Sequence, residues 1–253
     1  MASVDAREDE GRPGAGAPAG SPAAPIPVLF LTDLLDIGGA ETQLVSLLHA
    51  LDPARVRPIL CILRGEGALA PGVRVPLERV AMRGPLDAGA LARVLGIVRR
   101  QGVRAIYTTH VRSALMARLL RLVVRPPRPQ RRIVVVTSEH SYKSPPATPV
   151  PERLRRLTAG LSDRVVAVSE VQAQWLRATL RIPARRVIVL PNAVEPSRFA
   201  DLPEPAEVLR ELGIPTGEPL FVCIARLAPV KEPDTLLAAM EEAPGHLILV
   251  GDG

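Results

Sequence analysis

Short apolar runs recur along the chain, and each of them is followed by a stretch with helical spacing. A run of this kind fits a buried strand, and strands that alternate with helices assemble into a parallel sheet with helices on its faces. Six such runs precede residue 191, near 27–32, 57–63, 104–108, 132–137, 164–168 and 186–190. The sequence therefore predicts the α/β class, with a doubly wound parallel sheet.

The composition is that of a folded chain with a different N-terminal stretch. Apolar residues make up 47% of the sequence, whereas residues 1–25 are rich in Ala, Gly, Pro and Ser and show no apolar periodicity. This stretch predicts a disordered tail and not a secretory signal. No run approaches the roughly 18 apolar residues that span a membrane. Cys61 and Cys223 lie in separate apolar runs and are expected to be buried, reduced thiols, which fits a cytoplasmic protein.

A pair of glycines follows the first predicted strand. The loop after residue 31 leads to Gly38, Gly39 and Glu41, and apolar residues then recur with helical spacing at positions 40, 44, 47, 48 and 51. Glycines at such a turn let backbone N–H groups approach a ligand, although many turns use glycine for geometry alone. The pattern is not G-x-G-x-x-G, so a nicotinamide or flavin dinucleotide is not indicated.

Two cations flank a loop near the end of the chain. An apolar run at 221–225 ends in Arg226, Lys231 follows five residues later, and a helix is predicted directly behind. The carboxyl end of a parallel strand and the N-terminus of a helix both face the crevice where ligands bind, and the helix end favours anions. Arg226 and Lys231 therefore predict a diphosphate site. The alternative is a solvated pair on an ordinary loop.

Several segments in this order resemble the family 4 retaining glycosyltransferases of the GT-B fold. They lie at 37–51, 105–110, 164–170, 187–199, 221–231 and 247–253. The resemblance implies one complete Rossmann-like domain at 26–197, a linker at 198–217 and the first β-α-β unit of a second domain at 218–253. The family's paired glutamates, which hold the donor sugar, would follow this unit. The chain is therefore expected to be a C-terminally truncated fragment that is inactive alone.

The resemblance also implies a function. The enzyme would move a sugar from a nucleotide-sugar donor to a glycan or lipid-linked acceptor with retention, in cell-surface polysaccharide or glycolipid synthesis. Arg226, Lys231 and the amides of Gly38 and Gly39 would bind the donor diphosphate, with no cofactor or metal, and the sequence has no Asp-x-Asp motif. His110 would contact the donor sugar and stabilise charge as its bond breaks.

This sequence departs from the family pattern at two positions. Glu232 and Ala193 stand where the family often has glycine, and the charge of Glu232 could weaken the local positive potential. Two other functions stay open. One is a split half-enzyme that acts as a binding module and needs a partner chain. The other is a sugar-nucleotide epimerase, which shares the architecture.

Three further residues are candidates for the acceptor side of the cleft. His140 follows the apolar run 133–136, and Ser169 follows the run 165–168. Ser169 and Gln172 have the spacing of a capping box, which predicts a helix whose inward side carries positions 171, 175 and 178. Glu41 belongs to the glycine loop. For His140 and Ser169, a purely structural role is the alternative.

Basic residues concentrate in one segment, 118–132. It contains Arg118, Arg121, Arg125, Arg128, Arg131 and Arg132, in a chain of net charge +6. One interpretation is a surface for anionic lipid headgroups at the inner face of the cytoplasmic membrane. The other is a solvated arginine-rich face. Nucleic acid is not expected as a partner, because six aromatic residues in the whole chain leave little for base stacking.

Overall fold

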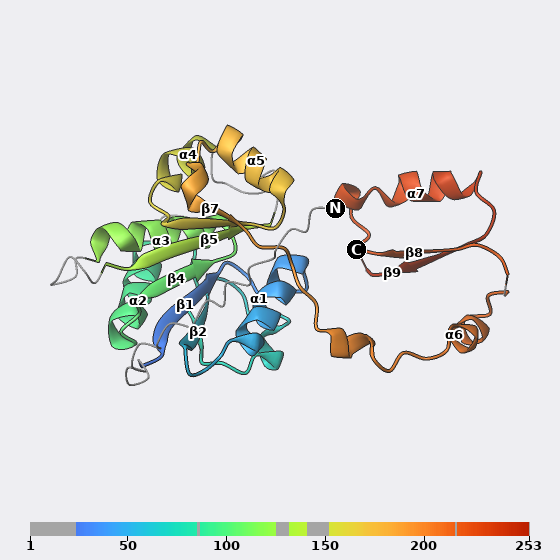
Figure 1. Cartoon of the computed structure of the whole chain (residues 1–253), viewed down its shortest axis with the longest axis horizontal. Helices are drawn as coiled ribbons and strands as arrows, with labels where there is room; N and C mark the ends of the chain where they lie inside the picture. Colours follow the sequence, from blue (N-terminus) through green and yellow to red (C-terminus); the bar gives the residue numbers. More distant parts are fainter. Residues whose placement is uncertain (1–23, 85–86, 125–131, 141–151, 216, 253) are drawn as a thin grey trace, which may run out of the picture. The chain divides into compact units, whose positions relative to one another are not determined.

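A computed structural model describes residues 24–84, 87–124, 132–140, 152–215 and 217–252 (Figure 1). The chain divides between Val194 and Glu195 into two compact units, which are described separately below. The first unit holds a seven-stranded parallel sheet in the order β3-β2-β1-β4-β5-β6-β7. The predicted α/β class with a parallel sheet is confirmed.

All six predicted strands of the first unit are present, and their ends lie within two residues of the expected ones. The strands are β1 (Ile26–Thr32), β2 (Val56–Ile62), β3 (Leu77–Arg79), β4 (Ala105–Thr108), β5 (Val134–Glu139), β6 (Arg164–Ala167) and β7 (Val187–Val189). The unpredicted strand, β3, pairs only with β2 and lies at the sheet edge. Its sequence, Leu-Glu-Arg, has no apolar run, because an edge strand is covered on fewer sides than a central one.

Helices cover both faces of this sheet. They are α1 (Gly39–Ala50), α2 (Ala88–Arg100), α3 (Val111–Val123), α4 (Glu152–Ala159) and α5 (Glu170–Thr179), with short 3-10 turns η1 (Ala70–Gly72) and η3 (Ala184–Arg186). In β1, Leu29 and Leu31 pack with α2 and α3, while Phe30 between them packs with α1. A strand buried on both faces reads as a continuous apolar run, which is why β1 was recognisable in the sequence.

Helix α5 begins as predicted, but only part of its expected inward side faces the sheet. Gln172, Ala173 and Leu176 are buried. Of the expected inward positions, Trp175 packs against the core, whereas position 178 is exposed and Val171 is 64% exposed. The expected inward side was therefore wrong for 171 and 178. Gln172 lies against the sheet because its Oε1 accepts a hydrogen bond from the Val168 N–H, at 2.7 Å.

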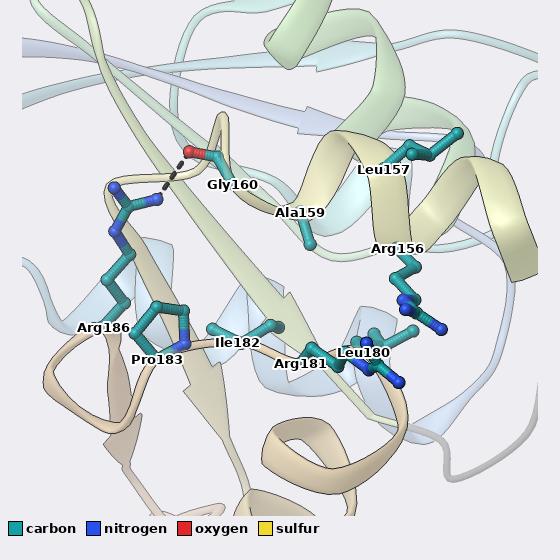
Figure 2. Close-up of a pocket in the computed structure, with 9 residues that line it drawn as sticks. All are labelled: Arg156, Leu157, Ala159, Gly160, Leu180, Arg181, Ile182, Pro183 and Arg186. Carbon is teal, nitrogen blue, oxygen red and sulfur yellow. Dashed lines mark hydrogen bonds between the residues drawn. The ribbon is translucent and has the colours of Figure 1, made fainter.

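At the amino-terminal edge of the same sheet, the C-terminal ends of α4 and α5 and the segment before β7 surround a pocket (Figure 2). The loops at this edge lead into β6 and β7. The carboxyl ends of the parallel strands lie at the opposite edge, so this pocket is separate from the crevice expected there.

The second unit contains one β-α-β unit. Its elements are η4 (Pro196–Phe199), α6 (Pro205–Glu211), β8 (Leu220–Ile224), η5 (Pro229–Lys231), α7 (Pro233–Met240) and β9 (His246–Val250). Strands β8 and β9 are parallel, with Leu220 opposite His246. A two-stranded sheet cannot bury a core by itself, and Val222 and Ile224 are correspondingly exposed.

The two cysteines differ in their surroundings. Cys61 is fully buried in β2, and burial raises the pKa of its thiol to about 12, with a further contribution from the charge of Glu78. Cys223 is only half-buried, so the expectation of a buried thiol was wrong there, because β8 has a single neighbouring strand. Neither cysteine forms a disulfide. Within the described ranges, no helix combines the length and apolar character needed to cross a bilayer.

Candidate active site

The strand order reverses direction between β1 and β4. From β1 the chain proceeds to β2 and β3 on one side, and β4 to β7 follow on the other. Ligands of open α/β sheets bind outside the carboxyl ends of the strands at such a point. Thr32 ends β1, and Thr109 and His110 follow β4 directly. The structure therefore places His110 at the switch point of the sheet.

The His110 ring has partners at both nitrogens. Its Nε2 lies 3.0 Å from Oε1 of Glu41, which belongs to the first turn of α1. Its Nδ1 lies 3.0 Å from Oγ1 of Thr32 and 3.2 Å from Oγ1 of Thr109. The His110 side chain is 26% exposed, so the ring is held from behind while part of it still faces outward.

The contacts of the ring suit a protonated His110. Thr32 donates its hydroxyl proton to the carbonyl oxygen of Leu34, at 2.8 Å. The Thr32 oxygen is then free to accept a hydrogen bond from Nδ1 of His110. At Nε2 the partner is a carboxylate, which accepts from an N–H donor. In the protonated state, His110 therefore forms an ion pair with the Glu41 carboxylate.

The pKa shifts agree with this assignment. Burial alone would lower the pKa of His110, but the hydrogen bond to Glu41 and the charges of Asp33, Glu41 and Glu139 outweigh it and raise the pKa. Burial would raise the pKa of Glu41, but its hydrogen bonds to His110 and to its own backbone N–H, with the charges of His110 and His140, lower it. Both partners are stabilised in their charged forms.

Asp33 leaves the His110 ring available for these contacts. His110 is the N-cap residue of α3, a position whose side chain usually accepts from the helix backbone. Here Asp33 Oδ1 accepts the Ser113 N–H instead, at 2.6 Å. The Ser113 hydroxyl accepts from the His110 N–H at 3.2 Å. Asp33, Thr32 and Thr109 were not among the predicted site residues.

Of the two glycines, Gly38 leaves space for the Glu41 side chain. Gly38 is the N-cap residue of α1 with extended backbone, and a Cβ there would collide with the Glu41 carboxylate. A Cβ on Gly39 would meet open space. Gly38 thus gives Glu41 room to fold back over the helix end, where a carboxylate is favoured by the helix dipole. Binding of a diphosphate by the Gly38 and Gly39 amides stays a prediction.

The other two cleft candidates lie at the same edge of the sheet. His140 follows β5, and its Nε2 lies 3.0 Å from the Ser138 hydroxyl. Burial and the charge of His110 lower the pKa of His140, against the opposing charge of Glu41. Ser169 follows β6 and accepts the Gln172 N–H at 3.2 Å, which confirms it as the N-cap of α5. A ligand contact of Ser169 stays a prediction.

Arg226 and Lys231 lie in the second unit, at the carboxyl end of β8. Arg226 follows the strand and Lys231 ends η5. The next residue, Glu232, is the N-cap of α7 and has left-handed backbone, with φ 51° and ψ 50°. Glycine adopts this conformation without strain, which gives a physical reason for the glycine that the family often has there.

A pocket of about 360 Å³ lies beside this loop. The side chains of Glu232 and Asp234 contribute to its lining, together with Leu227, Ala228, Pro229, Pro233 and Thr235. Arg226 and Lys231 are not among the lining residues. The structure therefore brings the two cations onto one loop, and their joint contact with a diphosphate stays a prediction.

Among the described residues of the arginine segment 118–132, Arg118 does not lie on a surface. Arg118 is only 3% exposed and donates to Ser162 and Thr158 at 3.0 and 3.1 Å. Burial lowers its pKa to about 10; the charge of Glu139 opposes this, and that of Arg155 adds to it. The sequence could not show that Arg118 lies on the inward side of α3.

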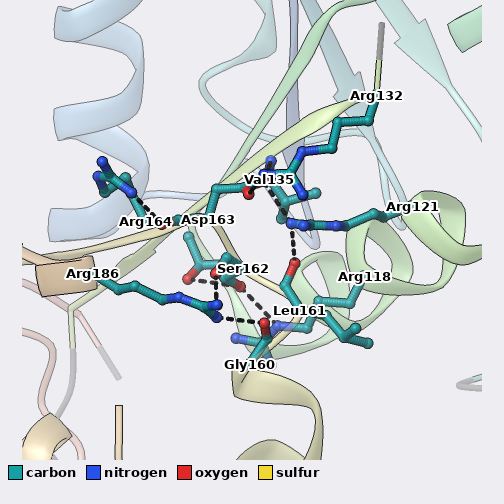
Figure 3. Close-up of polar contacts among 11 residues, drawn as sticks. Arg118, Arg121, Arg132, Val135, Gly160, Leu161, Ser162, Asp163, Arg164 and Arg186 are labelled. Atoms are coloured by element: carbon teal, nitrogen blue, oxygen red, sulfur yellow. Dashed lines mark hydrogen bonds and ion pairs between the residues drawn. The ribbon is translucent and has the colours of Figure 1, made fainter. Parts of the chain in front are cut away.

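Asp163 holds two further arginines of the segment (Figure 3). It forms ion pairs with Arg121 and with Arg132, the latter at 3.2 Å, and accepts the Val135 N–H at 2.9 Å. These contacts link α3, β5 and the loop before β6. Arg118 and Arg121 are therefore structural, whereas the Arg132 side chain is 65% exposed. Residues 125, 128 and 131 lie outside the described residues.

Among the described residues, no three His, Cys, Asp or Glu side chains are grouped so that they could hold a metal ion.

Known proteins resemble this chain in both sequence and structure. A D-inositol 3-phosphate glycosyltransferase of Segniliparus rotundus is 34% identical over 113 residues, which is 41% of this chain and 25% of the relative. The Anabaena protein HepE in complex with UDP superimposes with a TM-score of 0.71 at 21% identity, over 90% of this chain and 61% of HepE.

A third similar protein is the sucrose-phosphate synthase of Thermosynechococcus elongatus, with a TM-score of 0.67 at 18% identity, over 89% of this chain and 62% of the synthase. These two solved structures show that the fold is of the GT-B type. The chain spans less than two thirds of the length of each of the three proteins.

The match to a family model is more specific than the structural similarity. The sequence model of Glycosyltransferase Family 4 matches residues 37–198, a range that begins at the glycine loop and includes Glu41, His110, His140 and Ser169. Because this range is more than half of the chain, the protein belongs to Glycosyltransferase Family 4.

Proposed function

We propose that this chain takes part in the transfer of a sugar from a nucleotide-sugar donor to a glycan or lipid-linked acceptor, with retention at the anomeric carbon. Two solved structures of one neighbour, HepE, hold UDP and UDP-glucose, which supports a nucleotide-sugar donor. The observation that carries the proposal is the contact of the His110 ring with Glu41 and Thr32 at the switch point of the sheet.

The proposed chemistry needs a fixed positive charge beside the donor. As the glycosidic bond breaks, negative charge develops on the departing diphosphate. A protonated His110 cannot accept a proton, so it is no general base; it stabilises charge and orients the donor sugar. We assign Arg226 and Lys231 to the diphosphate and His140 to the acceptor side. Fixed cations would supply the charge that a metal supplies elsewhere.

The acceptor is proposed more broadly than the donor. A lipid-linked or glycan acceptor in cell-surface polysaccharide synthesis would place the reaction in the cytoplasm, at the inner face of the membrane. The name of the Segniliparus relative adds a phosphorylated polyol to the acceptors worth testing. Because the chain spans only part of its relatives, the alternative is a half-enzyme that needs a partner chain. The exposed apolar residues of β8 are compatible with such a partner.

The test is a nucleotide-release assay with a panel of UDP-sugars and GDP-sugars, with and without these acceptors. We expect acceptor-dependent release, from this chain alone or after a second chain is added, to fall by about 100-fold in His110→Ala, the size of effect typical for loss of a charge-stabilising group. His49→Ala is the control, because His49 lies in α1 and contacts the Arg74 N–H away from the site. Release without acceptor would favour an epimerase. Release only after a second chain is added would favour the half-enzyme.

A further inference from the structure

The pocket at the amino-terminal edge of the sheet has an unusual charge. It has a volume of about 430 Å³ and lies between the ends of α4 and α5 (Figure 2). Its lining consists of Arg156, Leu157, Ala159, Gly160, Leu180, Arg181, Ile182, Pro183 and Arg186. Three of these residues are arginines and none is acidic. The pocket therefore concentrates positive charge at the edge opposite His110.

The three arginines differ in their hydrogen bonds. Arg186 donates to the carbonyl oxygens of Gly160 and Ser162, so it is partly used in holding the loop before β6. Arg156 and Arg181 also line the pocket (Figure 2). Within the part of the chain that the structure describes, neither of them has a hydrogen bond or an ion pair. Two guanidinium groups that line one pocket with no carboxylate partner are suited to an anion.

The backbone of Arg181 is strained. Its φ is +52°, in the left-handed region, directly after the residue that caps the C-terminus of α5. Glycine is the residue that usually occupies this position, and a side chain there costs roughly 1 kcal/mol. The Arg181 side chain lines the pocket. Replacement of Arg181 by glycine would therefore remove a guanidinium group from the pocket and relieve the strain at the same time.

We propose that this pocket binds a phosphate ester. Guanidinium groups match phosphate oxygens in geometry and charge, and Arg156 and Arg181 supply two of them. The apolar side chains of Leu157 and Ile182 suit the carbon part of the ester. Leu157 is 80% exposed, so it is available to a ligand. The volume lies within the range of about 300–1,000 Å³ typical of small-molecule sites. This site is independent of the proposed transfer reaction.

The phosphate can come from a soluble ester or from the headgroup of an anionic lipid, and two probes separate these sources. Glycerol 3-phosphate is titrated into the full chain by calorimetry. Vesicles of phosphatidylcholine, with and without phosphatidylglycerol, are tested by co-sedimentation. The variants are Arg181→Gly and Arg156→Ala. Arg181→Gly relieves the backbone strain, so a loss of binding in it cannot be ascribed to misfolding. Arg99→Ala, an exposed arginine of α2 outside the pocket, is the matched control.

We expect one or both probes to bind, and binding to weaken by about tenfold in Arg181→Gly and in Arg156→Ala, as for the loss of one charged hydrogen bond. The Arg99→Ala variant should bind like the parent chain. Binding of glycerol 3-phosphate identifies a soluble ester, and binding of the anionic vesicles alone identifies a lipid headgroup. The proposal is overturned if neither probe binds, or if Arg99→Ala weakens binding as much as the two pocket variants do.

Discussion

Glu41 and His110 lie 69 residues apart in the sequence, and Oε1 of Glu41 accepts a hydrogen bond from Nε2 of His110 at 3.0 Å. The contact joins the first turn of α1 to the loop after β4, on the two sides of the switch point. Gly38 makes it possible, because a side chain there would occupy the place of the carboxylate. The glycine loop of this family member thus positions the Glu41 carboxylate against the His110 ring.

This ion pair predicts how stability depends on pH. The raised pKa of His110 gives stability that is complete below its ordinary value, 6.5, and is lost as pH rises through the raised value. The lowered pKa of Glu41 gives stability that is complete above its ordinary value, 4.5, and is lost as pH falls through the lowered value. The pair should therefore contribute most between pH 4.5 and 6.5.

The measurement is denaturant unfolding at several pH values, in the parent chain and in the double variant Glu41→Gln with His110→Gln. The difference in unfolding free energy between them should be largest inside that window. A difference that is constant across pH would contradict the assigned charges.

Replacement of Glu232 by glycine should stabilise the second unit. Glu232 has φ 51°, and relief of left-handed strain is worth up to about 1 kcal/mol. The same change removes a negative charge beside Lys231, so affinity for an anionic donor should also rise. Glu232→Gln is the matched control, because it removes the charge and keeps the strain. Thermal unfolding of both variants separates the two effects; equal melting temperatures would contradict the strain.

Asp33→Ala should destabilise the chain by about 1 kcal/mol, because it removes the acceptor for the Ser113 N–H at the start of α3. Asp33→Ser keeps a capping oxygen on a shorter side chain and should recover part of the loss. Denaturant unfolding gives both values. An Asp33→Ala variant as stable as the parent would show that α3 does not need this cap.

Arg118→Ala should be more damaging, with a loss of about 2–4 kcal/mol, because it leaves a cavity and unpaired hydroxyls at Ser162 and Thr158. Its effect should be on stability and not on membrane association. Arg104→Ala, at an exposed arginine just before β4, is a control that should be nearly neutral. Loss of vesicle binding in a folded Arg118→Ala variant would contradict this and would indicate that Arg118 contacts anionic lipid headgroups.

The sequence was sufficient for most of the sheet. Strands β1 and β2 were predictable because both their faces are buried, which produces long apolar runs. Strand β3 was missed because Leu77–Arg79 lies at the edge and carries two charged residues in three. The inward side of α5 was predicted correctly at Trp175 and wrongly at Val171, because Gln172, a polar residue, is buried next to it.

The site was only partly predictable. His110 could be placed at the end of a strand, since strand ends follow from apolar runs. Its partner Thr32 and the capping role of Asp33 depend on contacts between distant segments, and no local pattern shows these. The arginines of α3 were misread for the same reason: Asp163, which pairs with Arg121, lies 42 residues away.

The most direct test of the account is the protonation state of His110, followed by NMR through the pH titration of its ring. The account predicts a pKa above the ordinary histidine value of 6.5 in the parent chain, and a lower pKa in Glu41→Gln, which keeps the hydrogen bond and removes the charge. A pKa at or below 6.5 in the parent chain, unchanged in Glu41→Gln, would contradict the claim that Glu41 holds His110 as a cation at the switch point.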